Sequence, residues 1–127
     1  MHKTIAILAV AALAGIAAVG CGKSGSSGAG GGAENAEARS IYDSRCASCH
    51  GADGKGTGPA AAALKPKPQN YADAAWQKKV TDDELKTVIV KGGAGVGKSP
   101  LMPPNPDLES KPEVVTGLVA IVRNFGK

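Results

Sequence analysis

The sequence has few aromatic residues, few cysteines and no long run of charge of one sign. Its 127 residues include four aromatic side chains, three cysteines, 15 basic residues and 11 acidic residues. Three cysteines cannot all pair, and this number is far below that of a disulfide-built scaffold. The net charge of +4, without a run of five or six like charges, does not indicate nucleic-acid binding. We therefore expect one small domain in which the cysteines serve another chemistry.

An uncharged apolar segment, residues 5–19, lies close to the N-terminus. It is shorter than the roughly 20 residues that a permanent membrane span needs, so it predicts a secretory signal peptide over residues 1–20. The letters AVGC, which end at Cys21, resemble a lipobox, the site at which bacterial lipoproteins are lipidated on cysteine and cleaved, although Leu is the more usual first residue. We predict that Cys21 is lipidated. The alternative is a soluble exported protein in which Cys21 is a free thiol.

The segment that follows Cys21 is rich in small residues. Residues 22–33 hold six Gly and three Ser, and nothing in them could enter a core, so residues 21–33 are interpreted as a lipidated cysteine with a flexible tether. Twelve such residues span about 20 Å on average. The tether predicts that a folded domain, residues 34–127, is exported and held beside a membrane of the cell envelope. Gly22, rather than an Asp resembling an inner-membrane retention signal, favours the outer membrane.

Helical patterns account for most of residues 34–127. A helix is predicted over residues 36–47, where apolar side chains recur at helical spacing after acidic residues. A second helix is predicted from the capping box that begins at Thr81, and a third from Ser110 to the C-terminus, with Ser110 as its cap. A brief fourth helix is predicted over residues 73–79. No segment alternates like a half-buried strand, so we predict an all-α domain of three to four helices.

The cysteine pair lies in the motif CASCH, residues 46–50. Cys-x-x-Cys-His is the attachment signature of c-type haem: two thiols one helical turn apart add to the two vinyl groups, and the adjacent imidazole reaches the iron. A redox dithiol would need a strand-to-helix setting, and a zinc half-site would need further Cys or His ligands. The sequence offers neither, so Cys46 and Cys49 are predicted to bind one haem c covalently.

The candidate axial ligands of the haem iron can be identified because the chain has so few histidines and methionines. Without residues 1–20, the chain keeps one histidine, His50, and one methionine, Met102. Met102 lies in a segment with four prolines, residues 99–106, which restrict the backbone and suit a preset ligand better than a core side chain. We predict His50 and Met102 as the two ligands. Such ligation raises the reduction potential.

These motifs together resemble a class I monohaem cytochrome c of the short bacterial type. The resemblance covers residues 34–127: a helix that ends in CASCH, the glycine-rich run GADGKGTGP, a middle helix, the LMPP segment and a C-terminal helix. It implies a cytochrome c fold wrapped around one covalently attached haem, with the N- and C-terminal helices crossing. It also implies that the carbonyl of Pro59 accepts a hydrogen bond from His50, which would raise the donor strength of the imidazole. Tyr71 and Trp76 are candidate contacts for the haem propionates.

A formally complete Walker A pattern, G-x-x-x-x-G-K-[ST], spans Gly92 to Ser99. The pattern binds phosphates when a strand precedes it and a helix follows it. Here a capped helix precedes it and four prolines follow, and the domain has no room for a parallel sheet. The sequence therefore predicts no nucleotide site.

The predicted function is one-electron transfer, and we expect no enzymatic activity. The expected partners are a redox protein that donates the electron and one that accepts it, both at the membrane, and the chain is expected to be a monomer. Four lysines at positions 55, 65, 67 and 98 lie in loops expected near the haem rim, where they would either steer an acidic partner or be ordinary solvated side chains. The alternative function is a haem enzyme or gas sensor in which Met102 detaches from the iron.

Overall fold

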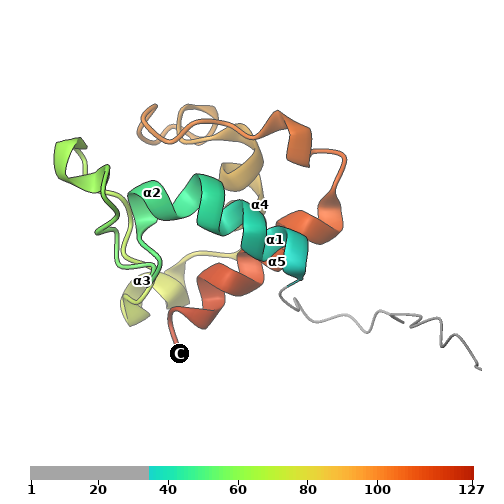
Figure 1. Ribbon diagram of the computed structural model, residues 1–127, viewed down its shortest axis with the longest axis horizontal. Helices are drawn as coiled ribbons and strands as arrows, with labels where there is room; N and C mark the ends of the chain where they lie inside the picture. Colours follow the sequence, from blue (N-terminus) through green and yellow to red (C-terminus); the bar gives the residue numbers. More distant parts are fainter. Residues whose placement is uncertain (1–34) are drawn as a thin grey trace, which may run out of the picture.

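The computed structural model describes residues 35–127, and these residues form helices joined by loops (Figure 1). No strand occurs in this part of the chain, which confirms the predicted all-α fold class. The predicted signal peptide, the predicted lipidation site Cys21 and the predicted tether lie outside the described residues. Among the described helices, none is long and apolar enough to cross a membrane.

The N-terminal helix is one helical segment in three parts: α1 (Ala36–Ile41), a wider π-helical turn (Tyr42–Cys46) and α2 (Ala47–His50). Asn35 caps its start, because the side-chain oxygen accepts a 2.7 Å hydrogen bond from the amide of Ala38. The segment ends at Gly51, whose φ of +82° suits glycine. The predicted helix is therefore confirmed, and it continues as far as His50.

The C-terminal helix α5 (Pro112–Asn124) packs closely against α1 (Figure 1). Gly117 lies at the contact, where a Cβ atom built on it would come within 2.8 Å of the Cβ of Ala38. Near the other end of the contact, the rings of Tyr42 and Phe125 pack with their centroids 5.4 Å apart. The pairing of the N- and C-terminal helices, expected from the family resemblance, is present. Glycine at position 117 allows the two backbones to approach.

The start of α5 differs from the prediction of a Ser110 cap. Lys111 directly precedes the helix and makes no side-chain cap, and Pro112 is the first helical residue. The Ser110 hydroxyl instead donates a 3.5 Å hydrogen bond to the carbonyl of Asp107. The prediction is wrong because a short 3₁₀ helix, Pro106–Leu108, turns the chain just before Ser110. Pro112, which has no N–H to satisfy, suits the first turn without a cap.

Two further helices follow the haem-motif loops: α3 (Ala74–Lys79) and α4 (Asp82–Lys91). The carboxylate of Asp73 caps α3 by accepting hydrogen bonds from two amides of its first turn. The predicted capping box at α4 is confirmed: Thr81 Oγ1 accepts from the amide of Glu84 at 3.2 Å, and the Glu84 carboxylate accepts from the amide of Thr81 at 2.8 Å. Both helices therefore lie where the sequence predicts them.

Arg123 links α5 to α3 and α4. Its guanidinium donates 2.8 Å hydrogen bonds to the carbonyls of Gln77 and Val80 and pairs with the carboxylate of Asp82 at 2.7 Å. These carbonyls lie at the end of α3, where helical partners are lacking. One side chain therefore fixes three helices relative to one another. Together these helices supply the apolar wall of the cavity described next.

Candidate haem site

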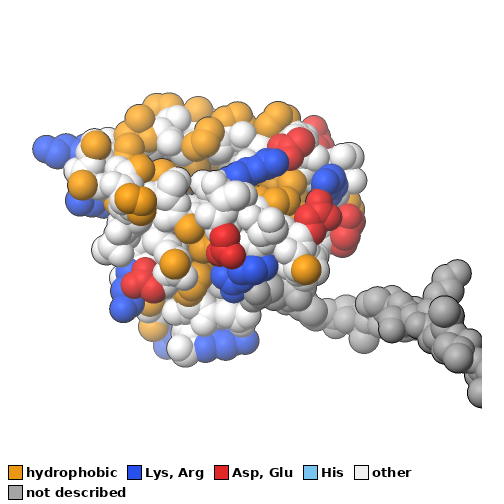
Figure 2. All heavy atoms as spheres, in the orientation of Figure 1, with side chains coloured by type: hydrophobic (Ala, Val, Ile, Leu, Met, Phe, Trp, Pro, Cys, Tyr) orange, Lys and Arg blue, Asp and Glu red, His pale blue; other side chains and the backbone are white. Residues whose placement is uncertain are grey.

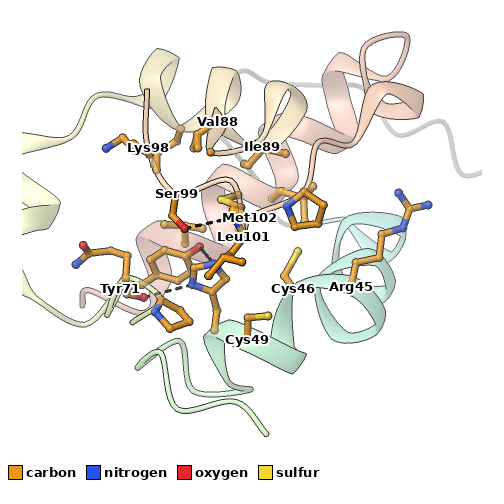
Figure 3. Close-up of a pocket in the computed structure, with 18 of the residues that line it drawn as sticks. Arg45, Cys46, Cys49, Tyr71, Val88, Ile89, Lys98, Ser99, Leu101 and Met102 are labelled. Carbon is orange, nitrogen blue, oxygen red and sulfur yellow. Dashed lines mark hydrogen bonds between the residues drawn. The ribbon is translucent and has the colours of Figure 1, made fainter. Parts of the chain in front are cut away.

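A cavity of about 400 Å³ lies between the N-terminal helix and the loop at residues 98–105 (Figure 3). The cavity is lined by all four side chains predicted to bind a haem and its iron: Cys46, Cys49, His50 and Met102. Most of the remaining wall is apolar and comes from α4, α5 and the loop at residues 64–71. The fold therefore brings the CASCH motif and the distant methionine to the same cavity.

Cys46 and Cys49 form no disulfide, and they lie half-buried in the wall of the cavity (Figure 3). Burial raises the pKa of Cys46 to about 11, against a smaller opposing effect of Arg45. A reactive dithiol needs the opposite, because thiolate attack requires a lowered pKa. Within the described residues, no group of three or more His, Cys, Asp or Glu side chains could hold a metal ion. The pair therefore suits thioether formation better than dithiol exchange or zinc binding.

His50 is a buried, oriented imidazole at the end of α2. Its Nδ1 lies 3.3 Å from the carbonyl of Gln69, and its Nε2 lies 3.1 Å from the hydroxyl of Tyr71. One tautomer satisfies both contacts: Nδ1–H donates to Gln69, and Nε2 accepts from Tyr71. Burial lowers the pKa of His50, an effect that the bond to Gln69 partly opposes, so the ring is neutral at pH 7. Nε2 therefore presents the lone pair that a metal requires.

The predicted hydrogen bond between His50 and Pro59 is absent, and Gln69 takes that place. Pro59 is exposed and lines a separate surface depression with residues of the loop around it. The reason lies in the backbone: the amides of Gly56 and Gly58 donate to the carbonyls of His50 and Cys49, at 2.8 and 3.2 Å, and fold this loop over the end of α2. The assignment of Pro59, which rested on the family resemblance, is corrected accordingly.

An aromatic stack lies beside the imidazole. The rings of Tyr71 and His50 are 4.5 Å apart and inclined by 13°, and Trp76 stacks on the other side of Tyr71 at 5.5 Å. Burial raises the pKa of Tyr71, so its hydroxyl keeps the proton that it donates to His50. The indole N–H of Trp76, by contrast, forms no hydrogen bond with the described residues. Both side chains line the cavity, and their roles as propionate contacts stay predictions.

Met102 is held in place through its backbone and its neighbours. Its carbonyl accepts a 2.9 Å hydrogen bond from the amide of Gly93, just beyond the end of α4. Asn105 anchors the same loop: its amide donates to the carbonyl of Val90 at 2.9 Å, and its side chain donates to the carbonyl of Ile89 at 2.8 Å. Carbonyls that would lack partners at the end of α4 therefore fix the path of the methionine loop.

One comparison with known proteins decides the family. The family model described as Cytochrome c matches residues 35–124. The chain belongs to the cytochrome c family. Searches of the curated proteins and of the solved structures found no match. Membership in this family means a haem-based electron carrier with covalently attached haem c, and Cys46 and Cys49 supply the attachment motif.

The residues around the cavity of this cytochrome c fit haem c. Two thiols, one neutral imidazole and one thioether line the same space, and they match the covalent and axial bonds that the cofactor makes. Buried leucines from three parts of the chain complete the wall: Leu85, Leu108 and Leu118. Such a wall suits the large apolar face of a porphyrin. The porphyrin would supply the apolar bulk that four aromatic side chains cannot.

The Walker-like segment of this cytochrome c serves as a connector. The amides of Val96 and Lys98 both donate to the carbonyl of Gly93, and the amide of Gly97 donates to Ala94. In a phosphate-binding loop these amides would point at the ligand. Here they close a short turn, Ala94–Val96, that leads from α4 to the methionine loop. The geometry therefore agrees with the sequence argument against a nucleotide site.

Three features of the site do not follow from the sequence motifs. These are the carbonyl of Gln69 at His50, the Tyr71–His50 hydrogen bond and the anchoring of the methionine loop by Asn105. A backbone carbonyl carries no sequence signal, and the stacking of Tyr71 depends on the path of a loop. The bond from Asn105 to the carbonyl of Ile89 joins residues 16 positions apart, so no local pattern indicates it.

Proposed function

We propose that this cytochrome c is a one-electron carrier whose haem iron keeps His50 and Met102 as axial ligands in both oxidation states. The observation that carries the proposal is the shared cavity: the single histidine and the single methionine of the described chain both line it, together with the two cysteines. When bound, haem c supplies the one-electron chemistry of Fe(III) and Fe(II).

The surrounding residues favour the reduced state of the iron. The thioether of Met102 is a soft donor, which stabilises ferrous iron and raises the potential. The buried leucines exclude water, and a low-dielectric wall has the same effect because it disfavours the extra positive charge of the ferric state. The bond from His50 to Gln69 fixes the ring, and Nε2, which contacts the Tyr71 hydroxyl, is the atom that would hold the iron.

Visible absorption spectra of the purified holo-protein test the ligation. The account predicts a far-red band in the ferric form, which reports a methionine ligand, and no rapid reaction of the ferrous form with carbon monoxide. Rapid carbon monoxide binding without the far-red band would overturn the proposal. That result would indicate an open iron site, as in a haem enzyme or a gas sensor.

We also propose that Cys21 carries lipid and that residues 21–33 tether the domain to a membrane of the cell envelope. The support is the AVGC sequence after an apolar segment and the glycine- and serine-rich run that follows. Redox proteins at that membrane would then donate and accept the electron. Mass spectrometry of the mature N-terminus tests the anchor: the expected first residue is an acylated Cys21, and an unacylated start elsewhere would refute lipidation.

A further inference from the structure

The side chain of Gln77, on α3, joins three parts of the chain. Its Nε2 donates a 2.7 Å hydrogen bond to the carbonyl of Tyr71 and a 2.8 Å hydrogen bond to the carbonyl of Val122. Its Oε1 accepts a 2.8 Å hydrogen bond from the guanidinium of Arg123. Only this orientation of the amide pairs every group, since the two carbonyls need donors and the guanidinium needs an acceptor. Gln77 therefore connects α3 and α5 to the segment that carries Tyr71.

The backbone of Tyr71 is held from both sides. Its amide donates a 2.7 Å hydrogen bond to the carbonyl of Gly54, in the glycine-rich loop, and its carbonyl accepts the bond from Gln77. The ring of Trp76 also stacks on the ring of Tyr71, with the centroids 5.5 Å apart. These contacts limit the motion of Tyr71, so its ring keeps one orientation.

Tyr71 in turn limits the rotation of the His50 imidazole. The two rings lie 4.5 Å apart and are inclined by only 13° (Figure 3). The other restraint on the imidazole joins Nδ1 to the carbonyl of Gln69 over 3.3 Å, which is long for an N–H···O hydrogen bond. A bond to one nitrogen restrains the imidazole at that atom, whereas contact with the Tyr71 ring restrains its whole plane.

We propose that Gln77 is a positioning residue of the haem site: it holds Tyr71 against His50 and thereby sets the orientation of the imidazole plane on the haem iron. The proposal rests on the proposed function, because it needs His50 as an axial ligand. The lone pair of Nε2 cannot bind iron and accept the Tyr71 hydroxyl proton at once, so the contact between the ring faces is the restraint on the ligand. Groups behind a ligating histidine orient it and tune the metal.

The charges near Gln77 decide which substitution isolates its hydrogen bonds. Lys78 and Lys79 follow Gln77 on α3, and Figure 2 shows lysine and arginine side chains at the lower edge of the molecule, near the C-terminus marked in Figure 1. A glutamate at position 77 would add attraction to these charges and to Arg123. Leucine is neutral and similar in volume, and it removes both donated hydrogen bonds. Gln77→Leu is therefore the test variant, and position 77 is not part of the cavity lining.

Proton NMR of the ferric, full-length holo-protein reports the orientation of the imidazole. The paramagnetic shifts of the haem methyl groups depend on the direction of the ligand plane, so Gln77→Leu should change their order or spread. At a solution potential equal to the wild-type midpoint, its ratio of ferrous to ferric haem should fall at least roughly twofold, because a loosened stack admits water, which favours the ferric charge. Unchanged methyl shifts with an unchanged ratio would overturn the proposal.

Gly117→Ala is the matched control for a general loss of stability. Its added Cβ would meet Ala38 and Asn35 rather than Gln77 or Tyr71. This variant should unfold more easily and still keep the methyl shifts and the ferrous-to-ferric ratio of the wild type. Equal changes in the two variants would show that general loosening of the fold turns the imidazole, and that outcome would overturn the proposal.

Hydrogen exchange in the unmodified holo-protein tests the same contact without any substitution. Both side-chain amide protons of Gln77 should exchange at least roughly tenfold more slowly than those of Gln69, whose Nε2 donates to the carbonyl of the adjacent Asn70 at an exposed site. Equal exchange rates would show that Gln77 does not hold Tyr71 and would overturn the proposal. The ferric far-red band of the same sample tests the proposed ligation separately, so the two failures are distinguishable.

Discussion

The two segments that supply the axial ligands are built in different ways. His50 ends a helix that packs on α5, and it is 9% exposed with both ring nitrogens in contact with other groups. Met102 lies in a proline-rich loop with an exposed neighbour at Leu101, and a few backbone and Asn105 hydrogen bonds hold it to the end of α4. On the proposed ligation, the helical side would hold the cofactor firmly, and the loop side would set its potential through Met102. Ligand loss should begin at Met102.

The largest effect is expected from removing both attachment thiols. Cys46→Ala with Cys49→Ala eliminates the groups that form the thioethers, so no haem should stay on the chain after denaturation. Haem staining of a denaturing gel measures this. Cys21→Ala is the control: it should keep covalent haem and lose membrane attachment. Covalent haem in the double variant would contradict the assignment of the motif.

Met102→Ala tests the loop side at its ligand. The variant opens the sixth position, so its ferrous form should bind carbon monoxide, and its potential should fall by on the order of 0.1 V, within the roughly 0.8 V range that axial ligands set. Potentiometric titration with optical detection measures the change. Leu101→Ala, one residue earlier, should keep the far-red band. A Met102→Ala protein with the spectra and potential of the wild type would show that Met102 is not the ligand.

Gly117→Ala tests the helical side away from the haem. The added Cβ would lie 2.8 Å from the Cβ of Ala38, which forces α1 and α5 apart. We expect a loss of about 1 to 3 kcal/mol in the free energy of unfolding, measured with denaturant. Adding Ala38→Gly should restore part of that stability, although glycine in a helix itself costs about 1 kcal/mol. Similar stability of Gly117→Ala and the wild type would contradict the close packing of these helices.

Asn105→Ala tests the anchoring of the loop. The change removes the side-chain hydrogen bond to Ile89 and leaves that carbonyl without this partner, which should cost about 1 kcal/mol. The far-red band should disappear on heating before the helical circular dichroism does, because the methionine loop opens first. Asn124→Ala provides the comparison at an exposed helix end, where the side chain accepts a hydrogen bond from Lys127. Simultaneous loss of both signals in Asn105→Ala would argue against a separately held loop.

The smallest effect is expected from Glu84→Gln at the start of α4. Hydrogen bonds from Thr81 hold the pKa of Glu84 below its usual value of 4.5. A lowered folded-state pKa contributes stability above the unfolded pKa, and that contribution is lost as the pH falls through the folded value. Unfolding at pH 7 should therefore be slightly easier for Glu84→Gln, and the difference should disappear at acid pH. A difference that is independent of pH would exclude this carboxylate as its source.

The helices and the haem motif follow from local signals, and the arrangement around them does not. The capping box at Thr81 and the spacing of Cys46, Cys49 and His50 depend on neighbours along the chain, so the sequence was sufficient for them. The hydrogen-bond partner of His50 depends on how the loop before Tyr71 folds back, so the family resemblance implies Pro59 where the structure has Gln69. The predicted cap at Ser110 is wrong for a similar reason, since the preceding turn redirects the side chain of Ser110.

Proton NMR of the ferrous holo-protein tests the central claim most directly. A methionine methyl bound to the iron lies over the porphyrin, so the ring current should move the Met102 methyl signal far upfield. The account predicts this shift, its absence in Met102→Ala, and its full return after one cycle of oxidation and reduction. A Met102 methyl signal in the ordinary methionine range would contradict ligation by His50 and Met102 and the carrier function built on it.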